Sequence, residues 1–158
     1  MEGLYVSEAL EVVSLLKERR LTLAAAESLT GGALAASIVS VPGASAVFAG
    51  GVVSYTDEIK AALLGVSVDT LAKHTAVSHE TAREMARGVR ERCGTDVGVS
   101  TTGSAGPDPC CGVEPGRFFV GICYGEDCDS FEFFVPADRE GVRRAAVLEA
   151  LRTVLGYV

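Results

Sequence analysis

Residues 26–32 read Ala26-Glu27-Ser28-Leu29-Thr30-Gly31-Gly32, and they place a hydroxyl, an acid and a pair of glycines where a strand passes into a helix. The apolar run 21–26 predicts a short buried strand, and the small residues 33–39 predict a helix directly after the stretch. Such a junction presents unpaired backbone N–H groups at the positive end of the helix, which suits a phosphate or an oxyanion. Ser28 follows the strand, where open α/β sheets usually place reactive groups. The alternative is that Ser28 or Thr30 only caps the helix.

The composition indicates one ordinary globular domain. The chain has 158 residues, of which 48% are hydrophobic and 22% charged, so it can bury a core and is not expected to be disordered. The net charge of −7 argues against a nucleic-acid partner, and no apolar run is long enough to cross a membrane. The N-terminal Met1-Glu2-Gly3 lacks the basic residues of a signal peptide. We therefore expect a soluble, cytoplasmic protein.

The cysteines give little support for a disulfide or metal framework. There are five of them, Cys93, Cys110, Cys111, Cys123 and Cys128, and an odd number without a signal peptide argues against a disulfide framework. The last four are a candidate zinc site, but their spacing matches no zinc ribbon or knuckle. Residues 123–128 are more typical of a hairpin turn. We therefore expect no metal.

Hydrophobic periodicity and turn residues predict an ordered series of elements. The series is a helix at 7–20, a strand at 21–26, a helix at 33–39, a strand at 47–54, a helix from Thr56 to Gly65, a helical turn at 69–73, a helix at 78–94, a strand at 96–102, strands at 118–124 and 130–135, and a helix after Asp138. Parallel crossovers come first and an antiparallel hairpin comes last. We therefore expect one domain over 1–158, an α/β/α sandwich with a mixed sheet.

Three segments are expected to meet at one edge of this sheet: 26–32, 53–60 and 101–108. The second carries Tyr55 and Lys60. A partly desolvated lysine near a serine has a lowered pKa and can act as its base. The alternatives are a solvated lysine on a helix surface and a tyrosine that packs on the core.

The third segment and the last helix add groups that bind anions. Residues 101–108 read Thr-Thr-Gly-Ser-Ala-Gly-Pro-Asp, in which glycines allow a ligand to approach closely and hydroxyls supply donors, although turns use the same residues. Arg139, Arg143 and Arg144 lie at the start of the last helix, where an arginine can bind phosphate through two hydrogen bonds.

Together these residues resemble the nicotinamide-nucleotide amidase family, which also forms the C-terminal domain of CinA competence/damage-inducible proteins. The resemblance extends from about Leu10 to Leu155. Its motifs in order are Ala-Glu-Ser-Leu-Thr-Gly-Gly at 26–32, Gly-Gly-Val-Val-Ser-Tyr at 50–55, Lys60 with Leu64-Gly65-Val66, Ala76-Val77-Ser78, Gly103-Ser104-Ala105-Gly106-Pro107 and Asp138-Arg139-Glu-Gly-Val-Arg143. Six motifs in the same order are much more specific than any one of them.

The resemblance implies hydrolysis of the carboxamide of nicotinamide mononucleotide to nicotinate mononucleotide and ammonia, in pyridine-nucleotide salvage. It implies no metal or organic cofactor, and a homo-oligomer. Carried over by position, Ser28 is the nucleophile, and Tyr55 and Lys60 activate it and move protons. The substrate-binding residues implied in the same way are Thr30, Gly31, Gly32, Thr102, Gly103 and Arg143.

The chain departs from the family pattern at several positions. Leu29 stands where the family usually has Cys, and Ser104 replaces an aliphatic residue. The segment 109–117 is shorter than usual and lacks a lysine, for which Arg117 is the candidate replacement. Two other functions therefore stay open: an amidase for another small amide, and a non-catalytic module that binds a nucleotide or a partner protein.

Overall fold

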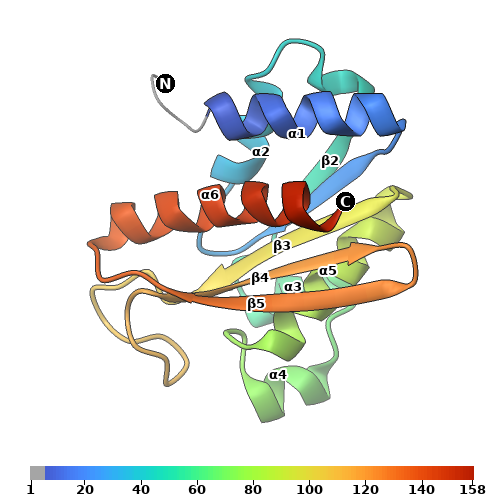
Figure 1. The fold of residues 1–158 in the computed structure, drawn as a ribbon. Helices are drawn as coiled ribbons and strands as arrows, with labels where there is room; N and C mark the ends of the chain where they lie inside the picture. The colour runs from blue at the N-terminus through green and yellow to red at the C-terminus, as the bar shows by residue number, and fades with distance from the viewer. Residues whose placement is uncertain (1–5) are drawn as a thin grey trace.

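A five-stranded mixed sheet lies between two layers of helices in the computed structural model, which describes residues 6–158 (Figure 1). Met1-Glu2-Gly3, on which the expectation about a signal peptide depends, lies outside the described residues. The strands are β1 (Leu23–Glu27), β2 (Phe48–Val53), β3 (Val97–Gly103), β4 (Arg117–Tyr124) and β5 (Asp127–Phe134). Their order in the sheet is β2-β1-β3-β4-β5; β1 is parallel to β2 and β3, whereas β3, β4 and β5 are antiparallel.

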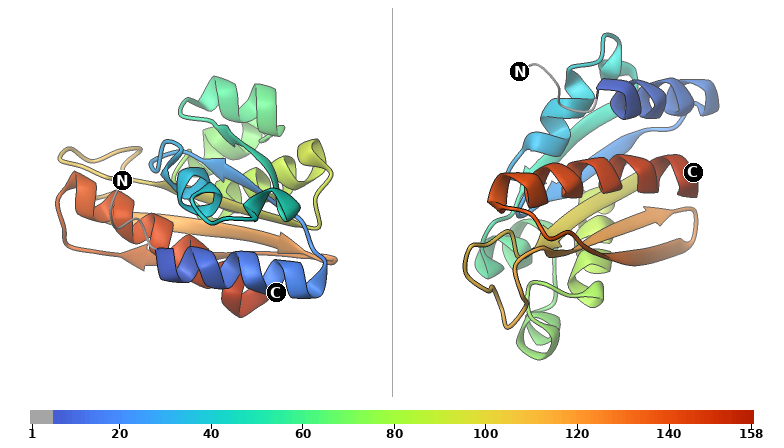
Figure 2. Two further views of the ribbon diagram at one scale, coloured as in Figure 1. Left: turned by 90° about the horizontal axis from the view of Figure 1, so that it is seen from above. Right: turned by 60° about the vertical axis from the view of Figure 1, so that its left-hand side comes forward.

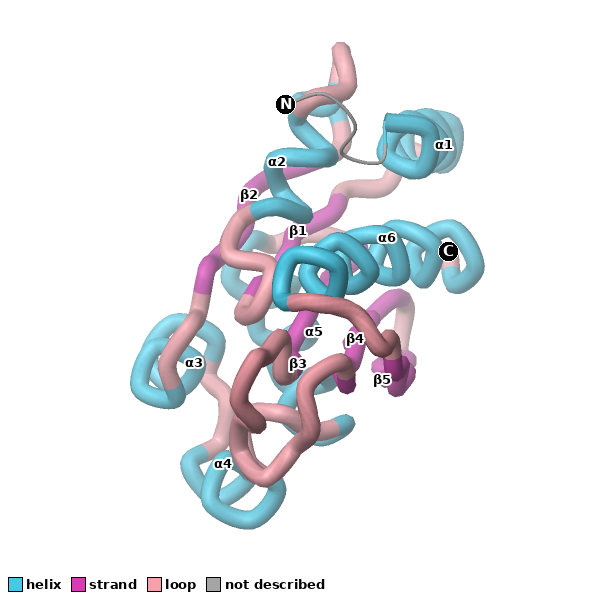
Figure 3. The backbone as a smooth tube through the Cα atoms, turned by 90° about the vertical axis from the view of Figure 1, so that its left-hand side faces the viewer, coloured by secondary structure: helices cyan, strands magenta, loops and turns pink. Residues whose placement is uncertain are grey.

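The helices divide between the two faces of the sheet (Figures 2 and 3). On one face lie α1 (Val6–Arg19), α2 (Ala33–Val39) and α6 (Arg139–Tyr157). On the other face α5 (His79–Cys93) packs against the sheet, with α3 (Asp57–Leu64) and α4 (Val68–His74) beside it. The predicted α/β/α sandwich with a mixed sheet is confirmed, and so is the order of its elements.

Apolar side chains are buried on both faces. The larger core includes Leu16, Ile38 and Leu151 against the sheet, and the smaller one includes Met85 and Val89 of α5. Burial of such side chains is the main source of stability for a domain of this size. Among the described helices, none is long and apolar enough to span a membrane.

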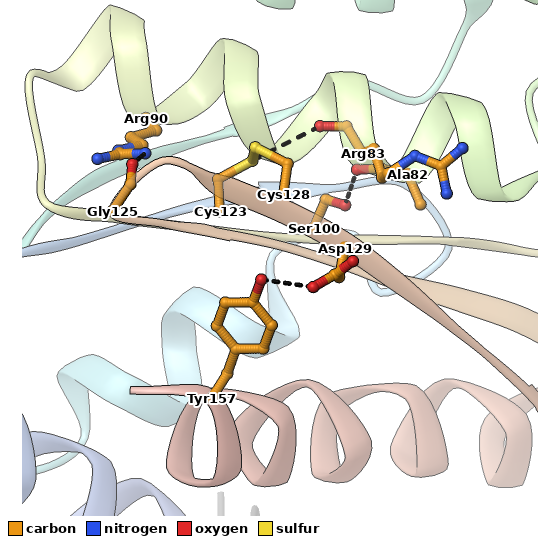
Figure 4. The surroundings of a disulfide bond; sticks show 9 residues. All are labelled: Ala82, Arg83, Arg90, Ser100, Cys123, Gly125, Cys128, Asp129 and Tyr157. Atoms are coloured by element: carbon orange, nitrogen blue, oxygen red, sulfur yellow. Dashed lines mark hydrogen bonds between the residues drawn. A yellow bond between two sulfur atoms is a disulfide. The ribbon is translucent and has the colours of Figure 1, made fainter.

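Helix α5 lies unusually close to the sheet because two strand residues have no side chain. A Cβ atom at Gly98 would overlap the carbonyl oxygen of Ala86, and one at Gly121 would overlap that of Ala82. The hydroxyl of Ser100, the residue directly opposite Gly121 in the sheet, donates a hydrogen bond of 2.6 Å to the Ala82 oxygen (Figure 4). These contacts fix β3, the strand that leads into the predicted site.

The β4–β5 hairpin contains a disulfide that the sequence argument did not predict. Cys123 and Cys128 lie directly opposite each other in the antiparallel register and are bonded to each other (Figure 4). The hairpin itself was predicted, but β5 begins at Asp127 rather than at residue 130, because the turn needs only Gly125 and Glu126. The longer strand brings the two cysteines into register, so the expectation against disulfides was wrong for this pair.

Candidate active site

A cavity of about 180 Å³ opens at the edge of the sheet where β1, β2 and β3 end. The three predicted segments, 26–32, 53–60 and 101–108, all contribute side chains to it, so their convergence is confirmed. The chain passes from β1 to β2 on one side and then to β3 on the other, which makes this edge a topological switch point. Ligands of open α/β sheets usually bind at such a point.

Ser28 and Lys60 meet inside this cavity. Lys60 Nζ lies 3.0 Å from Ser28 Oγ and donates a hydrogen bond of 2.7 Å to the backbone oxygen of Ser54. Lys60 is fully buried although it belongs to the short helix α3. The alternative of a solvated lysine on a helix surface is therefore wrong.

Burial also changes the chemistry of Lys60. Desolvation of the ammonium lowers the pKa of Lys60 below its usual value of 10.5, and the negative charge of Asp57 opposes this effect only in part. A lysine with a lowered pKa is more often neutral, and a neutral amine has a lone pair that can accept the proton of a nearby hydroxyl. The pair of Ser28 and Lys60 has the geometry of a nucleophile and its base.

Glu27 has a role that the sequence argument did not assign. Its buried carboxylate accepts hydrogen bonds from the backbone N–H groups of Gly32, Leu34 and Ala35, at 2.8–3.2 Å, and from the Thr30 hydroxyl at 2.6 Å. It thereby caps α2, whose N-cap residue, Gly32, has no capping side chain of its own. The alternative that Ser28 or Thr30 caps the helix is wrong.

The same carboxylate corrects the expectation of an anion site at this junction. The N–H groups at the start of α2 already bind Glu27, and the Gly31 N–H donates to the Ser28 oxygen at 3.2 Å. Thr30, Gly31 and Gly32 are absent from the lining of the cavity. Gly31 and Gly32 instead permit the tight turn after Ser28, because both have a positive φ, +59° and +103°.

Two arginines of α6 divide the roles that the sequence argument gave to Arg143. Arg143 lies outside the lining of the cavity and holds the turn after Ser28: its Nε donates to the oxygen of Leu29 at 2.9 Å, and Nη2 donates to the oxygen of Thr30 at 3.0 Å. Arg139, one helical turn earlier, does line the cavity. It donates to the oxygen of Gly106 and, at 3.1 Å, to the hydroxyl of Tyr55.

Three other predicted residues, Tyr55, Thr102 and Gly103, line the cavity, but their contacts differ from the roles expected for them. Tyr55 is 61% exposed and lies at the mouth, where Arg139 is its hydrogen-bond partner, so it does not pack on the core. The hydroxyl of Thr102 donates to the oxygen of Ala76 at 2.6 Å, so its proton is not available to an oxyanion. Gly103 is required by the close approach of β4, since a Cβ there would overlap Phe118.

Backbone N–H groups are the remaining candidates for an oxyanion site. Among residues 6–158, the N–H groups of Leu29 and Ala105 have no hydrogen-bond acceptor, and both residues line the cavity. Leu29 directly follows Ser28 in the turn that Arg143 holds. The Leu29 N–H, one residue after Ser28, is therefore a candidate donor for an oxyanion that forms at Ser28.

The shortened loop places new groups at the cavity, although not the one expected. Arg117 binds Glu114 and Glu132 instead of entering the cavity, so it does not replace the missing lysine. Cys110 and Cys111 line the cavity instead. From the sequence, the pair was considered only as part of a candidate zinc site with Cys123 and Cys128. No cluster of three or more His, Cys, Asp or Glu suited to a metal occurs within the part of the chain that the structure describes.

Two carboxylates complete the lining and were not predicted as site residues. Asp57 comes from the first turn of α3 and Asp108 from the loop after β3. Both lie inside segments that were predicted to converge, so position was a signal for them. Their residue type was not, because Asp is also common at helix starts and in turns.

Comparison with known proteins supports one family. The family model of the CinA C-terminal domain matches residues 6–158. A CinA-like protein of Frankia casuarinae is 46% identical over 143 residues, which are 90% of this chain and 33% of that protein. The chain spans about a third of the length of the curated relatives it matches.

Solved structures agree over the full length of the domain. A CinA superfamily protein from Escherichia coli has a TM-score of 0.95 at 29% identity, covering 100% of this chain and 93% of its own. Competence damage-inducible protein A from Klebsiella pneumoniae has a TM-score of 0.93 at 31% identity, covering 96% and 95%. The match in sequence and in structure shows that the chain belongs to the CinA C-terminal domain family.

Proposed function

We propose that this protein hydrolyses the carboxamide of nicotinamide mononucleotide to nicotinate mononucleotide and ammonia, with Ser28 as the nucleophile. The observation that carries the proposal is the buried amine of Lys60, 3.0 Å from the Ser28 hydroxyl in an open cavity. A protein that only binds a nucleotide gains nothing from burying an amine without a carboxylate partner, because that burial costs stability. The same pair is a working unit for attack on an amide.

The chemistry begins with proton transfer to Lys60. Ser28 Oγ attacks the carboxamide carbon while the neutral amine of Lys60 takes its proton, and the carbonyl oxygen becomes an oxyanion. The N–H groups of Leu29 and Ala105 would stabilise this oxyanion, a contribution of about 10²–10³ in rate per donor in other hydrolases. The tetrahedral intermediate then collapses and its C–N bond breaks, while the Lys60 ammonium gives its proton to the departing nitrogen, which leaves as ammonia.

In the second half of the reaction, the same groups activate a water molecule that hydrolyses the acyl-enzyme. The acyl group is now an ester of Ser28, and the neutral Lys60 can take a proton from the attacking water. Collapse of the second tetrahedral intermediate releases nicotinate mononucleotide and returns the proton to Ser28. Lys60 therefore serves as base and as acid in turn, which a pKa lowered toward neutrality favours.

The lining of the cavity fits the charges of this substrate. The cavity of about 180 Å³ is smaller than the 300–1,000 Å³ typical of sites for drug-sized ligands, so it would hold the ring and leave the ribose phosphate near the mouth. Arg139 lies at that mouth beside Tyr55 and can bind a phosphate. Asp57 and Asp108 carry the negative charge that suits a pyridinium ring.

The test is ammonia release from nicotinamide mononucleotide, with the product identified by mass. Ser28→Ala removes the nucleophile and should abolish release while leaving the fold and substrate binding intact. Ser45→Ala, an exposed serine outside the cavity, is the matched control and should retain full activity. Release that persists in Ser28→Ala would refute the proposed nucleophile.

A second series tests the substrate. Nicotinamide riboside lacks the phosphate, and nicotinamide lacks the ribose phosphate, so turnover should fall in that order if Arg139 binds phosphate. If a different small amide is turned over faster, the protein is an amidase for that compound, and the 109–117 segment is the candidate cause of the different substrate preference. Saturable binding without ammonia release would support a non-catalytic module.

A further inference from the structure

Cys110 and Cys111 form a tight turn at the cavity. The backbone N–H and oxygen of Cys110 both bond to Val113, at 3.0 and 2.8 Å, so Cys111 and Gly112 are the central residues of a two-residue turn. Both have a positive φ, +56° and +74°, as a type I′ turn requires. Cysteine rarely adopts this conformation, because its Cβ crowds the backbone. The turn itself therefore does not favour a cysteine at position 111.

The turn brings the two thiols together on the cavity wall. Their sulfur atoms lie 3.3 Å apart, both cysteines are exposed, and both line the cavity that contains Ser28 and Lys60. Cys110 is also fixed to the loop by a hydrogen bond from its N–H to the Ser104 hydroxyl at 3.2 Å. Neither sulfur has a role in the proposed hydrolysis. The third free cysteine, Cys93, lies at the end of α5 and does not line the cavity.

We propose that Cys110 and Cys111 are a redox-active dithiol, which a low-molecular-weight disulfide such as oxidised glutathione converts to a vicinal disulfide. One thiolate attacks a glutathione sulfur, which forms a mixed disulfide and releases one glutathione thiolate. The neighbouring thiolate then attacks the Sγ atom of the first cysteine, which forms the Cys110–Cys111 bond, breaks the bond to glutathione and releases the second glutathione thiolate. Two protein thiols are oxidised, one glutathione disulfide is reduced, and both protons end on the released glutathione.

Closure of this ring changes the cavity. The sulfur atoms must approach from 3.3 Å to a bond length of about 2 Å, which draws the two side chains together and reshapes the turn. The wall they form faces the same space as Lys60. Oxidation is therefore expected to reduce turnover of a substrate in this cavity, a consequence that rests on the function proposed above.

The thiol chemistry is tested without any assay of activity. In Cys93→Ser, the tryptic peptide 93–117 contains only Cys110 and Cys111, and the separate peptide 118–139 contains Cys123 and Cys128. Reduced protein is treated with oxidised glutathione, alkylated and digested. We expect peptide 93–117 to lose two hydrogen atoms, to resist alkylation, and to recover both thiols with dithiothreitol.

Two other outcomes of the same experiment would overturn the proposal. One is alkylation of both cysteines after treatment, and the other is a stable glutathione adduct that does not proceed to a ring. Cys111→Ser in the Cys93→Ser background removes the resolving thiol, so Cys110 should stop at the mixed disulfide. A loss of two hydrogen atoms in that variant would overturn the proposal, because a peptide with one cysteine cannot form the Cys110–Cys111 bond.

Turnover gives an independent measurement. Oxidation should reduce ammonia release by Cys93→Ser, and dithiothreitol should restore it. The triple variant Cys93→Ser/Cys110→Ser/Cys111→Ser, whatever its own rate, should not respond to oxidised glutathione. If the reduced protein releases no ammonia, the proposed function fails, but the mass of peptide 93–117 still decides whether the dithiol is redox-active.

Discussion

Two buried ionisable side chains lie on either side of Ser28, and they differ in how fully they are bonded. Glu27 is 2% exposed and accepts hydrogen bonds from three backbone N–H groups and one hydroxyl. Lys60 is 0% exposed, and among the described residues its amine has only a backbone oxygen and the Ser28 hydroxyl as partners. The Glu27 carboxylate has four donors around it, whereas the Lys60 amine has two neutral partners and no carboxylate in contact.

This difference separates a structural charge from a reactive one. A buried carboxylate with a full set of donors stabilises the turn that it caps, because removing it would leave those donors unpaired. A buried amine with few partners destabilises its own charged form, and the lowered pKa of Lys60 is the result. Burial alone does not identify a functional residue; a buried ionisable group with a shifted pKa in a cavity is the better candidate.

The comparison is tested most directly by Lys60→Met, which keeps an unbranched apolar side chain, one atom shorter, and removes the amine. We expect turnover of nicotinamide mononucleotide to fall by about 10³ or more, because Ser28 loses its base. We expect the free energy of unfolding to change by no more than about 1 kcal/mol, since a buried charge with few partners contributes little net stability. Steady-state kinetics and urea denaturation measure the two effects.

Lys73→Met is the control for this variant, because Lys73 is an exposed lysine of the adjacent helix α4. It should change neither quantity. If Lys60→Met kept its activity and lost stability, Lys60 would be a structural residue and the comparison with Glu27 would fail.

Glu27→Ala should have the opposite profile, with a large effect on stability. Three backbone N–H groups at the start of α2 lose their acceptor, so we expect the free energy of unfolding to fall by about 4 kcal/mol. Glu27→Gln keeps one acceptor oxygen and should lose less. Urea denaturation measures both, with the exposed Glu18→Ala as the control. If Glu27→Ala lowered the free energy of unfolding by no more than about 1 kcal/mol beyond Glu18→Ala, its effect would be that of an exposed side chain. Water would then have replaced the carboxylate as the acceptor.

The two arginines of α6 should separate in kinetics. Arg143→Ala frees the turn that carries Ser28, so we expect kcat to fall by about tenfold with KM nearly unchanged. Arg139→Ala removes the cation at the mouth and should raise KM for nicotinamide mononucleotide with little change in kcat. Arg144→Ala, an exposed neighbour bonded only to Glu140 among the described residues, is the control. If Arg143→Ala instead raised KM and Arg139→Ala lowered kcat, Arg143 would be the residue that binds substrate and Arg139 the one that positions Ser28.

The smallest expected effect is on the pH dependence of stability. The folded state lowers the pKa of Lys60 below the usual 10.5 of the unfolded chain, so between these two values the unfolded state binds more protons. Stability should therefore rise with pH in that window, by at most about 1.4 kcal/mol per pH unit. Urea denaturation at several pH values between the folded-state pKa of Lys60 and 10.5 gives the free energy of unfolding of wild type and of Lys60→Met. The difference between the two proteins is the contribution of Lys60. A difference that does not vary with pH would contradict the lowered pKa.

The fold could be predicted in detail because local signals agree with the global arrangement. Thr56 and Ser78 each cap the helix that they precede, as Asp138 does, and Gly65 and Gly94 end two of the helices in left-handed conformations. The proximity of Ser28 and Lys60 could also be predicted, because parallel strands bring their carboxyl ends to one edge.

The remaining features of the site depend on geometry that residue types do not contain. Residue types do not show whether Glu27 or Thr30 caps the helix, because this depends on which side chain lies close enough to accept from the N–H groups at the start of α2. The choice between Arg139 and Arg143 depends on how α6 crosses the loop, since the two differ by one helical turn. The Cys123–Cys128 bond depends on a register that the turn sets to within one residue.

The hold of Arg143 on the turn after Ser28 has a consequence for protein synthesis. The two hydrogen bonds join residues that are 114 and 113 positions apart in the chain. Because domains emerge from the ribosome N-terminus first, the turn after Ser28 is made long before the helix that holds it. The turn after Ser28 would then gain these two bonds only once α6 has left the ribosome and packed against it.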